Sequence, residues 1–293
     1  MQIFSGSSNR DLAEKIAKIL GTKLGEMEIS QFANGETRVW VKEKKIEKSV
    51  IVVQSLSSPT NEHLVEFCLI CDALQRGGAT DIAAVIPWMG YSKQDKVFRV
   101  GEPLSAKVVA QIIQTTKIKK LITFDLHNRA IMGFFDIPTI ELSAKSIFLE
   151  YFRSRITDKM IVVAPDAGSV KSSSNFAREL KLPIAYMDKR RDYLTGKVDV
   201  MGMSGEVKGQ HVVIVDDLIV TGCTIIEAAK YLKAQGALTV TVAATHHLYV
   251  PGAQEKLVAS DIGEIVVTDT VQPTNGGKLK ILSVAQAIVD ELQ

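Results

Sequence analysis

The segment Val212–Thr224, VVIVDDLIVTGCT, has the residue types and the spacing of an anion-binding turn. An apolar run leads into two adjacent acids, Asp216 and Asp217, and a short Thr/Gly stretch then leads into a helical pattern. The first turn of a helix leaves backbone N–H groups unpaired at the positive end of its dipole, so Thr221–Thr224 would cradle a phosphate group. The acids could accept hydrogen bonds from sugar hydroxyls or hold a hydrated cation. A tight turn capped by a threonine is the alternative for this segment alone.

Acids and histidines also follow other apolar runs of the chain. These residues are Asp125, His127, Asp166, His246 and Asp269. In open α/β sheets, ligands bind beyond the carboxyl ends of the strands, where such side chains would gather. A single acid at this place is often only a helix N-cap, but polar groups at the ends of several strands together indicate a binding site.

A cluster of charges, Asp188–Arg191 (DKRR), opens a polar stretch in the second half of the chain. The stretch lies between a strand expected near Ile184–Met187 and the apolar run Val212–Val215. Polar loops of this length are uncommon in compact domains unless they are functional. A solvated surface is the ordinary interpretation of such a cluster, but its position after a strand and beside the anion-binding turn favours a role. Fixed cations stabilise the charge on a transferring phosphoryl group.

Short continuous apolar runs alternate with amphipathic segments along the whole chain. Strands that are apolar on both faces belong to parallel sheets covered by helices on two sides, so the alternation predicts an α/β fold. The expected strands are Ser49–Gln54, Asp81–Pro87, Lys120–Leu126, Met160–Asp166, His211–Asp217, Thr239–His246 and Glu264–Thr270. The expected helices are Asn9–Leu20, Asn61–Arg76, Ser105–Thr115, Ser143–Arg155, Ser169–Leu180, Thr224–Ala234 and Ser283–Leu292. Because the order repeats in both halves, we expect two similar doubly wound domains, 1–142 and 143–293, each with a mostly parallel sheet.

The composition excludes several classes of function. The 35 basic and 33 acidic residues give a net charge of +2, so no basic field indicates a nucleic-acid partner. The N-terminal segment has no apolar signal core, and no stretch reaches the roughly 18 apolar residues of a membrane span. The three cysteines form no disulfide framework. These features predict a cytoplasmic protein that binds neither nucleic acid nor a membrane.

Cys68 and Cys71 form a C-x-x-C motif within EHLVEFCLICDAL. The periodicity around them is helical, and no second pair of cysteines or histidines lies nearby in the sequence. Packing inside a helix is therefore the favoured interpretation. A redox site or a zinc site is the alternative.

Nine short stretches in order resemble the ribose-phosphate pyrophosphokinase family, also called phosphoribosyl pyrophosphate synthetases. The anion-binding turn by itself resembles the phosphoribosyl-binding loop of the phosphoribosyltransferase fold, which the resemblance implies for both domains. Any one stretch is weak, but nine in order over nearly the whole chain are specific. The stretches are SGSSNRDLA near the N-terminus, FANGE at 32–36, YSKQDK at 91–96, PLSAK at 103–107, FDLHNRAIMGFFDIP at 124–138, PDAG at 165–168, DKRR at 188–191, the turn itself, and VVTDT at 266–270.

This resemblance implies transfer of the pyrophosphoryl group of ATP to the C1 hydroxyl of ribose 5-phosphate, with Mg²⁺ as the cofactor. Ribose 5-phosphate would lie on the turn, against Asp216, Asp217, Val220, Thr221, Gly222, Cys223 and Thr224. Lys189 and Arg191 correspond to the family's cations that stabilise the transition state. The family also implies a homo-oligomer, a hexamer built from dimers, in which ATP is bound partly by a neighbouring subunit.

The residues implied to bind ATP lie in the first half of the chain and are Phe32, Asn34, Glu36, Lys93, Gln94, Asp95 and His127. An aromatic ring offers a purine a stacking face, although core packing is the better expectation for a lone phenylalanine such as Phe32. His127 and Asp166 resemble the family's metal-associated pair. Mg²⁺ prefers oxygen ligands, so Asp166 is the natural ligand, and His127 could act through a bound water or on the phosphate itself.

Some positions depart from the family's pattern. Val220 and Cys223 stand where an acid and a glycine are common, Asn34 replaces an Asp, and Lys93 replaces an Arg. Lysine does not reproduce the bidentate phosphate contacts of arginine. We therefore expect an active enzyme with altered kinetics.

Two alternative functions remain open at this stage. A nucleobase phosphoribosyltransferase would share the sugar-phosphate turn but would need no second nucleotide-binding half. A non-catalytic relative would only assemble with an active synthetase and regulate it. A P-loop kinase is excluded because the chain contains no G-x-x-x-x-G-K-[ST] motif.

Overall fold

The computed structural model describes residues 1–191, 198–274 and 276–293, and for 189–191 and 198–201 it describes the backbone alone. Strands and helices alternate along the chain, so the α/β class predicted from the apolar pattern is confirmed. The chain forms two compact units. The first contains Met1–Ser143, Asp269–Gln272 and Ser283–Gln293, and the second contains Ala144–Thr268 and Pro273–Leu282. Within the described residues, we find no helix with the length and hydropathy of a membrane span.

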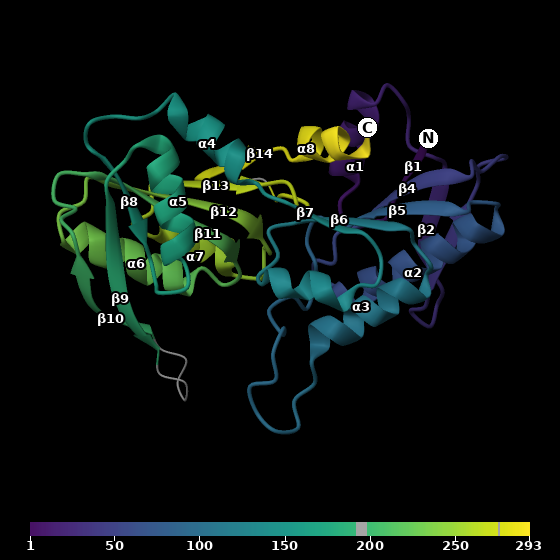
Figure 1. Ribbon diagram of the computed structural model, residues 1–293, viewed down its shortest axis with the longest axis horizontal. Coiled ribbons are helices and arrows are strands. Elements are labelled where there is room, and N and C mark those ends of the chain that lie inside the picture. The colour runs from purple at the N-terminus through teal and green to yellow at the C-terminus, as the bar shows by residue number, and fades with distance from the viewer. Residues whose placement is uncertain (192–197, 275) are drawn as a thin grey trace. The chain divides into compact units, whose positions relative to one another are not determined.

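A five-stranded parallel sheet forms the centre of the first unit, with the strand order β1-β4-β5-β6-β7. The strands are β1 (Gln2–Ser5), β4 (Ser49–Val53), β5 (Asp81–Val85), β6 (Lys120–Phe124) and β7 (Thr139–Leu142). One face is covered by α2 (Thr60–Arg76) and α3 (Ser105–Thr115), and the other by α1 (Arg10–Ile19) and α8 (Ala285–Leu292) (Figure 1). Because helices cover both faces, a strand such as β4 is apolar and buried along nearly all of its length.

The helix α2 settles the question of the C-x-x-C motif. Its inner face buries Phe67, Ile70, Cys71 and Leu74 in the core of the first unit, and Cys68 packs against the same core. Burial raises the pKa of the Cys68 thiol and, more strongly, that of the Cys71 thiol. Both thiols are therefore poor nucleophiles at neutral pH, and the expected packing role is confirmed.

A two-stranded hairpin, β2 (Met27–Gln31) and β3 (Thr37–Val41), was not predicted from the sequence. Its inner residues Met27, Ile29, Val39 and Val41 pack against the core of the first unit. The residues between them on β3, Arg38 and Trp40, are exposed to solvent. Half-buried antiparallel strands contain no continuous apolar run, and a search for such runs therefore misses them. The turn of this hairpin contains the FANGE sequence.

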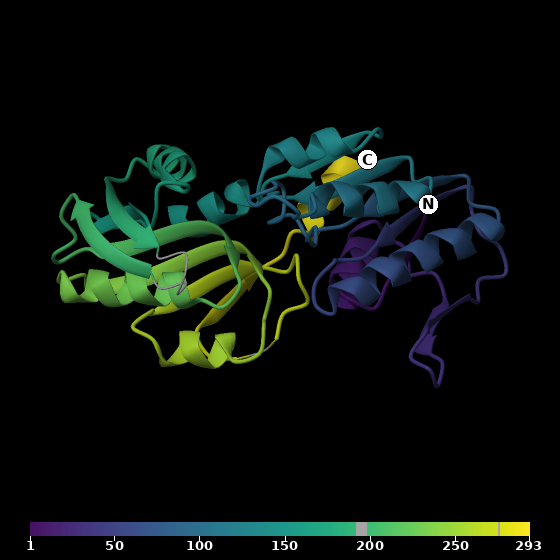
Figure 2. The same cartoon turned by 90° about the horizontal axis from the view of Figure 1, so that it is seen from below.

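A seven-stranded sheet forms the centre of the second unit, with the order β10-β9-β8-β11-β12-β13-β14. All neighbours are parallel except β9 and β10. The strands are β8 (Met160–Ala164), β9 (Ile184–Arg191), β10 (Val198–Ser204), β11 (His211–Ile219), β12 (Thr239–His247), β13 (Glu264–Thr268) and β14 (Leu279–Leu282). Seen from below, α6 (Cys223–Ala234) and α7 (Ala253–Ala259) lie on the opposite side of this sheet from α4 (Lys145–Arg153) and α5 (Val170–Leu180) (Figure 2).

The expectation of a long polar loop after Asp188 is wrong in part. Strand β9 continues through Lys189 to Arg191, and it pairs antiparallel with β10 at the edge of the sheet. Val200 lies opposite Lys189 and Val198 lies opposite Arg191. An antiparallel edge pair can expose one face to water, so its sequence can be polar and still form strands.

The C-terminal part of the chain returns to the first unit. After β13, residues 269–272 join the first unit, β14 belongs to the second, and α8 packs beside α1, which leaves both chain ends in the first unit (Figure 1). The predicted domain boundary after residue 142 does not account for these C-terminal residues, which belong to the first unit. The short helix η1 (Arg129–Phe134) leads from β6 to β7.

Candidate functional site

The two acids of the anion-binding turn lie inside β11, whereas the sequence placed them at the end of a strand. Strand β11 pairs with β12 as far as Ile219 opposite His247, but with β8 only as far as Ile214 opposite Val163. Asp216 and Asp217 therefore lie on a part of β11 that extends beyond the carboxyl end of β8. This extension leaves one edge of β11 without a neighbouring β8 residue, next to the loop that contains Asp166.

The carboxylates of this edge influence one another. Burial raises the pKa of Asp216 to about 8, and the charges of Asp217 and, more weakly, of Asp166 act in the same direction. The Asp217 N–H donates to Asp216 Oδ1 at 2.9 Å, which partly offsets these effects. A cation, or the hydroxyl groups of a sugar as donors, would favour the ionised form of Asp216.

The connection between β11 and α6 is short and requires glycine. Gly222 caps α6 with a φ of 75°, in the left-handed region, and a Cβ at this position would lie 2.8 Å from Leu257 Cδ2. Thr221 and Cys223 are exposed, and the Cys223 N–H reaches Thr221 Oγ1 only at 3.5 Å. An amide this weakly satisfied at the first residue of a 12-residue helix is available to an anion.

Asp166 follows β8 and holds its own loop in place. Its Oδ1 accepts from the Ser169 N–H at 3.0 Å, while Ser169 Oγ donates to the Asp166 carbonyl at 2.9 Å. Within the described part of the chain, hydrogen bonds reach only Oδ1 of this carboxylate.

The predicted catalytic residues lie in β9. The backbones of Lys189 and Arg191 are described there, two residues apart on the strand that pairs with β10. Their side chains lie outside the described part of the structure. Their catalytic role remains a prediction.

The FANGE residues form the exposed turn of the β2–β3 hairpin. The Phe32 N–H donates to the Glu36 carbonyl at 2.9 Å, and the Glu36 N–H donates to Asn34 Oδ1 at 3.2 Å. The ring of Phe32 is 53% exposed, which excludes the core packing expected of a lone phenylalanine. The turn therefore presents an aromatic face, an amide and a carboxylate to solvent.

The second group of predicted ATP-binding residues lies between β5 and α3. Lys93 is exposed, and Gln94 Oε1 accepts from Ser105 Oγ at 2.7 Å. Asp95 Oδ2 accepts from Asn128 Nδ2 at 2.6 Å. The fold thus joins the YSKQDK segment to the residue beside His127, a contact between residues 33 positions apart.

Glu141, which the sequence did not single out, supports the segment around His127. Its Oε1 accepts from the Leu126 N–H at 2.9 Å, and its Oε2 lies 2.6 Å from Arg129 Nε. Burial raises the pKa of the Glu141 carboxyl, and these two donors oppose that shift. The backbone of Asp125, with a φ of 28°, turns there in the left-handed region. A single acid in an amphipathic stretch gives no sequence signal for this role.

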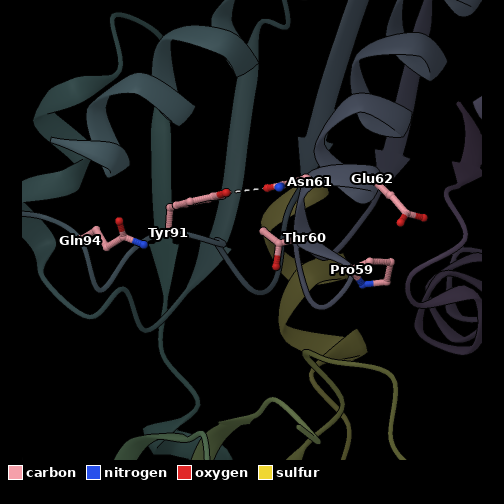
Figure 3. A pocket seen from close by; sticks show the side chains of 6 residues that line it. All are labelled: Pro59, Thr60, Asn61, Glu62, Tyr91 and Gln94. Carbon is pink, nitrogen blue, oxygen red and sulfur yellow. Dashed lines mark hydrogen bonds between the residues drawn. The ribbon is translucent and has the colours of Figure 1, made fainter. Parts of the chain in front are cut away.

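An open pocket of about 450 Å³ lies beside Gln94 in the first unit. It is lined by Pro59, Thr60, Asn61, Glu62, Tyr91 and Gln94, as Figure 3 shows, with Tyr91 Oη donating to Asn61 Oδ1 at 2.5 Å across one side. Of the predicted ATP-binding residues, only Gln94 lines this pocket. Tyr91 belongs to the YSKQDK stretch, but nothing in the sequence distinguished Pro59–Glu62.

The predicted metal-binding residues belong to different units, His127 to the first and Asp166 to the second. Among the described residues, no three His, Cys, Asp or Glu side chains are grouped to hold a metal ion. A structural zinc site needs about four such ligands, whereas Mg²⁺ is held by one or two carboxylates together with waters and substrate phosphates. The Asp166 carboxylate therefore fits Mg²⁺.

Comparison with known proteins gives a consistent result over the whole chain. Residues 1–116 match the family model of the N-terminal domain of ribose phosphate pyrophosphokinase, and residues 134–273 match that of the phosphoribosyl transferase domain. The chain is 38% identical to a ribose-phosphate pyrophosphokinase of Caldanaerobacter subterraneus, over 100% of the chain and 93% of the relative. It is 39% identical to one of Agrobacterium fabrum, over 94% and 89%. A phosphoribosylpyrophosphate synthetase structure from Mycobacterium smegmatis superposes with a TM-score of 0.89, at 33% identity and over 99% and 97% of the two chains.

Proposed function

Because the chain belongs to the ribose-phosphate pyrophosphokinase family, we propose that it transfers the pyrophosphoryl group of ATP to the C1 hydroxyl of ribose 5-phosphate, releasing AMP. The observation that carries this proposal is the turn at 220–224, with the weakly bonded Cys223 amide at the start of α6 and two acids on the adjoining extension of β11. The amides suit a phosphomonoester, and the acids suit the hydroxyls of its sugar.

In this proposal the 5-phosphate lies on Val220–Thr224, and Asp216 and Asp217 orient the ring hydroxyls. Donating hydroxyls or an approaching cation would favour the ionised form of Asp216, whose pKa burial raises. Val220 contributes only its backbone, so one polar contact common in the family is missing. We expect this change to weaken the binding of ribose 5-phosphate and to leave the chemistry intact.

The triphosphate end of ATP would face Lys189 and Arg191, two cationic residues of β9. Attack on the β-phosphorus spreads negative charge over several oxygens, and fixed cations stabilise that charge without reorganising. Phe32, Asn34, Glu36, Lys93, Gln94, Asp95 and His127 would hold the nucleotide. The exposure of Phe32 supports this assignment, since a ring left in water on a hairpin turn has no packing role to explain it.

Asp166 would hold Mg²⁺ through its carboxylate, the ligand type that Mg²⁺ prefers, and His127 would act through a water or on the phosphate itself. When bound, the ion neutralises charge on the phosphates. The residues of the chain position the two substrates around it. We further propose that the protein works in the cytoplasm as a homo-oligomer, a hexamer built from dimers, as the family implies.

The family assignment favours this function over a nucleobase phosphoribosyltransferase, because the matched model of the first 116 residues is specific to the pyrophosphokinases. It also favours an enzyme over a non-catalytic relative, since the named relatives over the full length are themselves pyrophosphokinases.

One assay tests the proposal: purified protein with Mg·ATP and ribose 5-phosphate, followed by AMP release. The wild type should release AMP, and Lys189→Ala should lower kcat by about 100-fold or more while calorimetry shows ribose 5-phosphate binding largely unchanged. Lys230→Ala, which removes an exposed cation from α6, is the matched control and should turn over normally. A Lys189→Ala variant with normal turnover would remove β9 from the mechanism, and a wild type that makes no AMP would refute the activity.

A further inference from the structure

His247 lies directly behind the phosphate-binding turn. It is the last residue of β12, it is fully buried, and it pairs across the sheet with Ile219, the last residue of β11. The Leu248 N–H donates to the Ile219 carbonyl at 3.0 Å. The turn begins with the next residue, Val220, so the position of its first peptide depends on this pair of strand ends.

The hydrogen bonds of the His247 ring define its tautomer. The Tyr249 N–H donates to Nδ1 at 3.0 Å, so Nδ1 is the acceptor and Nε2 has the proton. Nε2 lies 3.1 Å from Gln254 Oε1, to which it donates. The ring of Tyr249 stacks on the imidazole with a centroid separation of 4.0 Å and an interplanar angle of 4°. Every polar atom of a fully buried side chain is therefore used, and the imidazole stays neutral because burial lowers its pKa to about 4.

The same histidine fixes the helix on which the turn rests. Gln254 belongs to α7 and also donates from Nε2 to the Gly276 carbonyl at 3.3 Å. One turn further along α7, Leu257 packs against Gly222, close enough that a Cβ on the glycine would lie 2.8 Å from it. His247 is thus connected to both ends of the turn. It contacts the start of the turn through Ile219, and the end of the turn through Gln254 and Leu257 of α7.

We propose that His247 is a positioning residue that sets the geometry of the phosphate-binding turn by joining the ends of β11 and β12 to α7. This inference rests on the proposed binding of a sugar phosphate at 220–224. His247 does not touch the ligand. Its removal should shift the backbone amides of the turn relative to each other, and because a phosphate is bound by several amides at once, small shifts weaken all of its hydrogen bonds together.

The test uses two substitutions of His247 and one of its partner. His247→Phe keeps the ring stack on Tyr249 and loses both hydrogen bonds, and it should raise KM and the calorimetric Kd for ribose 5-phosphate by about tenfold, the loss expected of one good hydrogen bond. KM for ATP and kcat should change by less than about twofold. His247→Gln, whose amide can replace Nε2 as a donor, should restore much of the affinity. Gln254→Leu should reproduce the loss, and the double variant should be no worse than His247→Phe.

His211 provides the matched control, because it lies at the opposite end of the same two strands, where its Nδ1 contacts Thr239 Oγ1 at 2.9 Å. His211→Phe should leave the ribose 5-phosphate affinity unchanged. The proposal is overturned if His247→Phe and Gln254→Leu bind ribose 5-phosphate like the wild type, or if KM for both substrates and kcat worsen together, which indicates general damage. If His247→Phe does not fold, Gln254→Leu decides alone. If the wild type releases no AMP, the proposed reaction is wrong. The calorimetric Kd for ribose 5-phosphate would still test the role of His247, because it does not depend on turnover.

Discussion

The buried carboxylate of Asp269 accepts a hydrogen bond from Lys15 Nζ at 2.7 Å, although 254 residues separate the two in sequence. The second oxygen accepts from the Val284 N–H at 2.8 Å, and the Asp269 carbonyl accepts from Asn9 Nδ2 at 2.7 Å. One residue therefore joins the start of α1 to the chain that leads into α8. The sequence grouped Asp269 with the polar ends of strands, but its contacts are those of a structural anchor for the first unit.

Asp269→Ala should lower the free energy of unfolding by about 2 kcal/mol, because it leaves the Val284 N–H buried without an acceptor and Lys15 without its partner. Asp269→Asn should cost less, since an amide oxygen can still accept from Val284. Urea unfolding measures both variants. Lys15→Met separates the ion pair from the backbone contact, because it removes only the cation. A stability of Asp269→Ala equal to that of the wild type would show that the anchor contributes nothing.

Asp216 should make the stability of the second unit depend on pH. Burial and the charge of Asp217 raise its folded pKa above the ordinary value of 3.8, so above pH 3.8 the folded chain keeps a proton that the unfolded chain has lost. Stability therefore falls as pH rises above this value, by up to about 1.4 kcal/mol per pH unit. Asp216→Asn should flatten the profile and stabilise the protein near pH 8. The measurement is urea unfolding from pH 5 to 8, with Asp158→Asn on the surface as the control, and equal slopes in Asp216→Asn and wild type would contradict the expectation.

Gly222→Ala should damage the phosphate-binding turn for two separable reasons. The left-handed φ costs roughly 1 kcal/mol for alanine, and the new Cβ also meets Leu257 at 2.8 Å. Gly21 has a similar φ of 68° with nothing within 4 Å of its Cβ position, so Gly21→Ala measures the backbone cost alone. We expect Gly222→Ala to lose more stability than Gly21→Ala, and also ribose 5-phosphate affinity.

Leu257→Ala alone should be destabilising because it truncates a fully buried core side chain, but Leu257→Ala and Gly222→Ala together should cost less than the sum of the two, since the shorter side chain makes room for the methyl group. If the two glycine variants prove equally stable in chemical unfolding, the contact with Leu257 is not limiting.

Cys223 should be the reactive cysteine of the chain. It is exposed at the first residue of α6, whereas Cys71 is fully buried and burial raises the pKa of both Cys68 and Cys71. Iodoacetamide should label Cys223 first, and saturating ribose 5-phosphate should slow that labelling because the sugar phosphate covers the residue. Peptide mass spectrometry follows the three cysteines separately, and Cys223→Ser is the control. Labelling at the same rate with and without ribose 5-phosphate would place the phosphate elsewhere.

The elements that contain the turn could be predicted because their signals are local. The apolar run that became β11, the acids and the small residues before α6 are contiguous, and the glycine is required at one backbone position with a φ of 75°. The hairpin β2–β3 and the pair β9–β10 could not be predicted in the same way, because antiparallel strands with one solvated face contain no continuous apolar run. For Phe32, only the exposed fraction of the side chain shows whether the ring packs in the core or lies at the surface, and the local sequence does not determine that fraction.

The sequence by itself determined the α/β alternation, the anion-binding character of Thr221–Thr224, and the resemblance to one family, since all three are carried by residues close together in the chain. Only the tertiary structure decided which neighbours those residues have. It placed Asp216 and Asp217 on an extension of β11 beyond β8, placed His247 and Leu257 behind Gly222, and joined Asp269 to Lys15. These relationships depend on strand order and on the return of the chain to its first unit, which long-range packing sets and no short segment encodes.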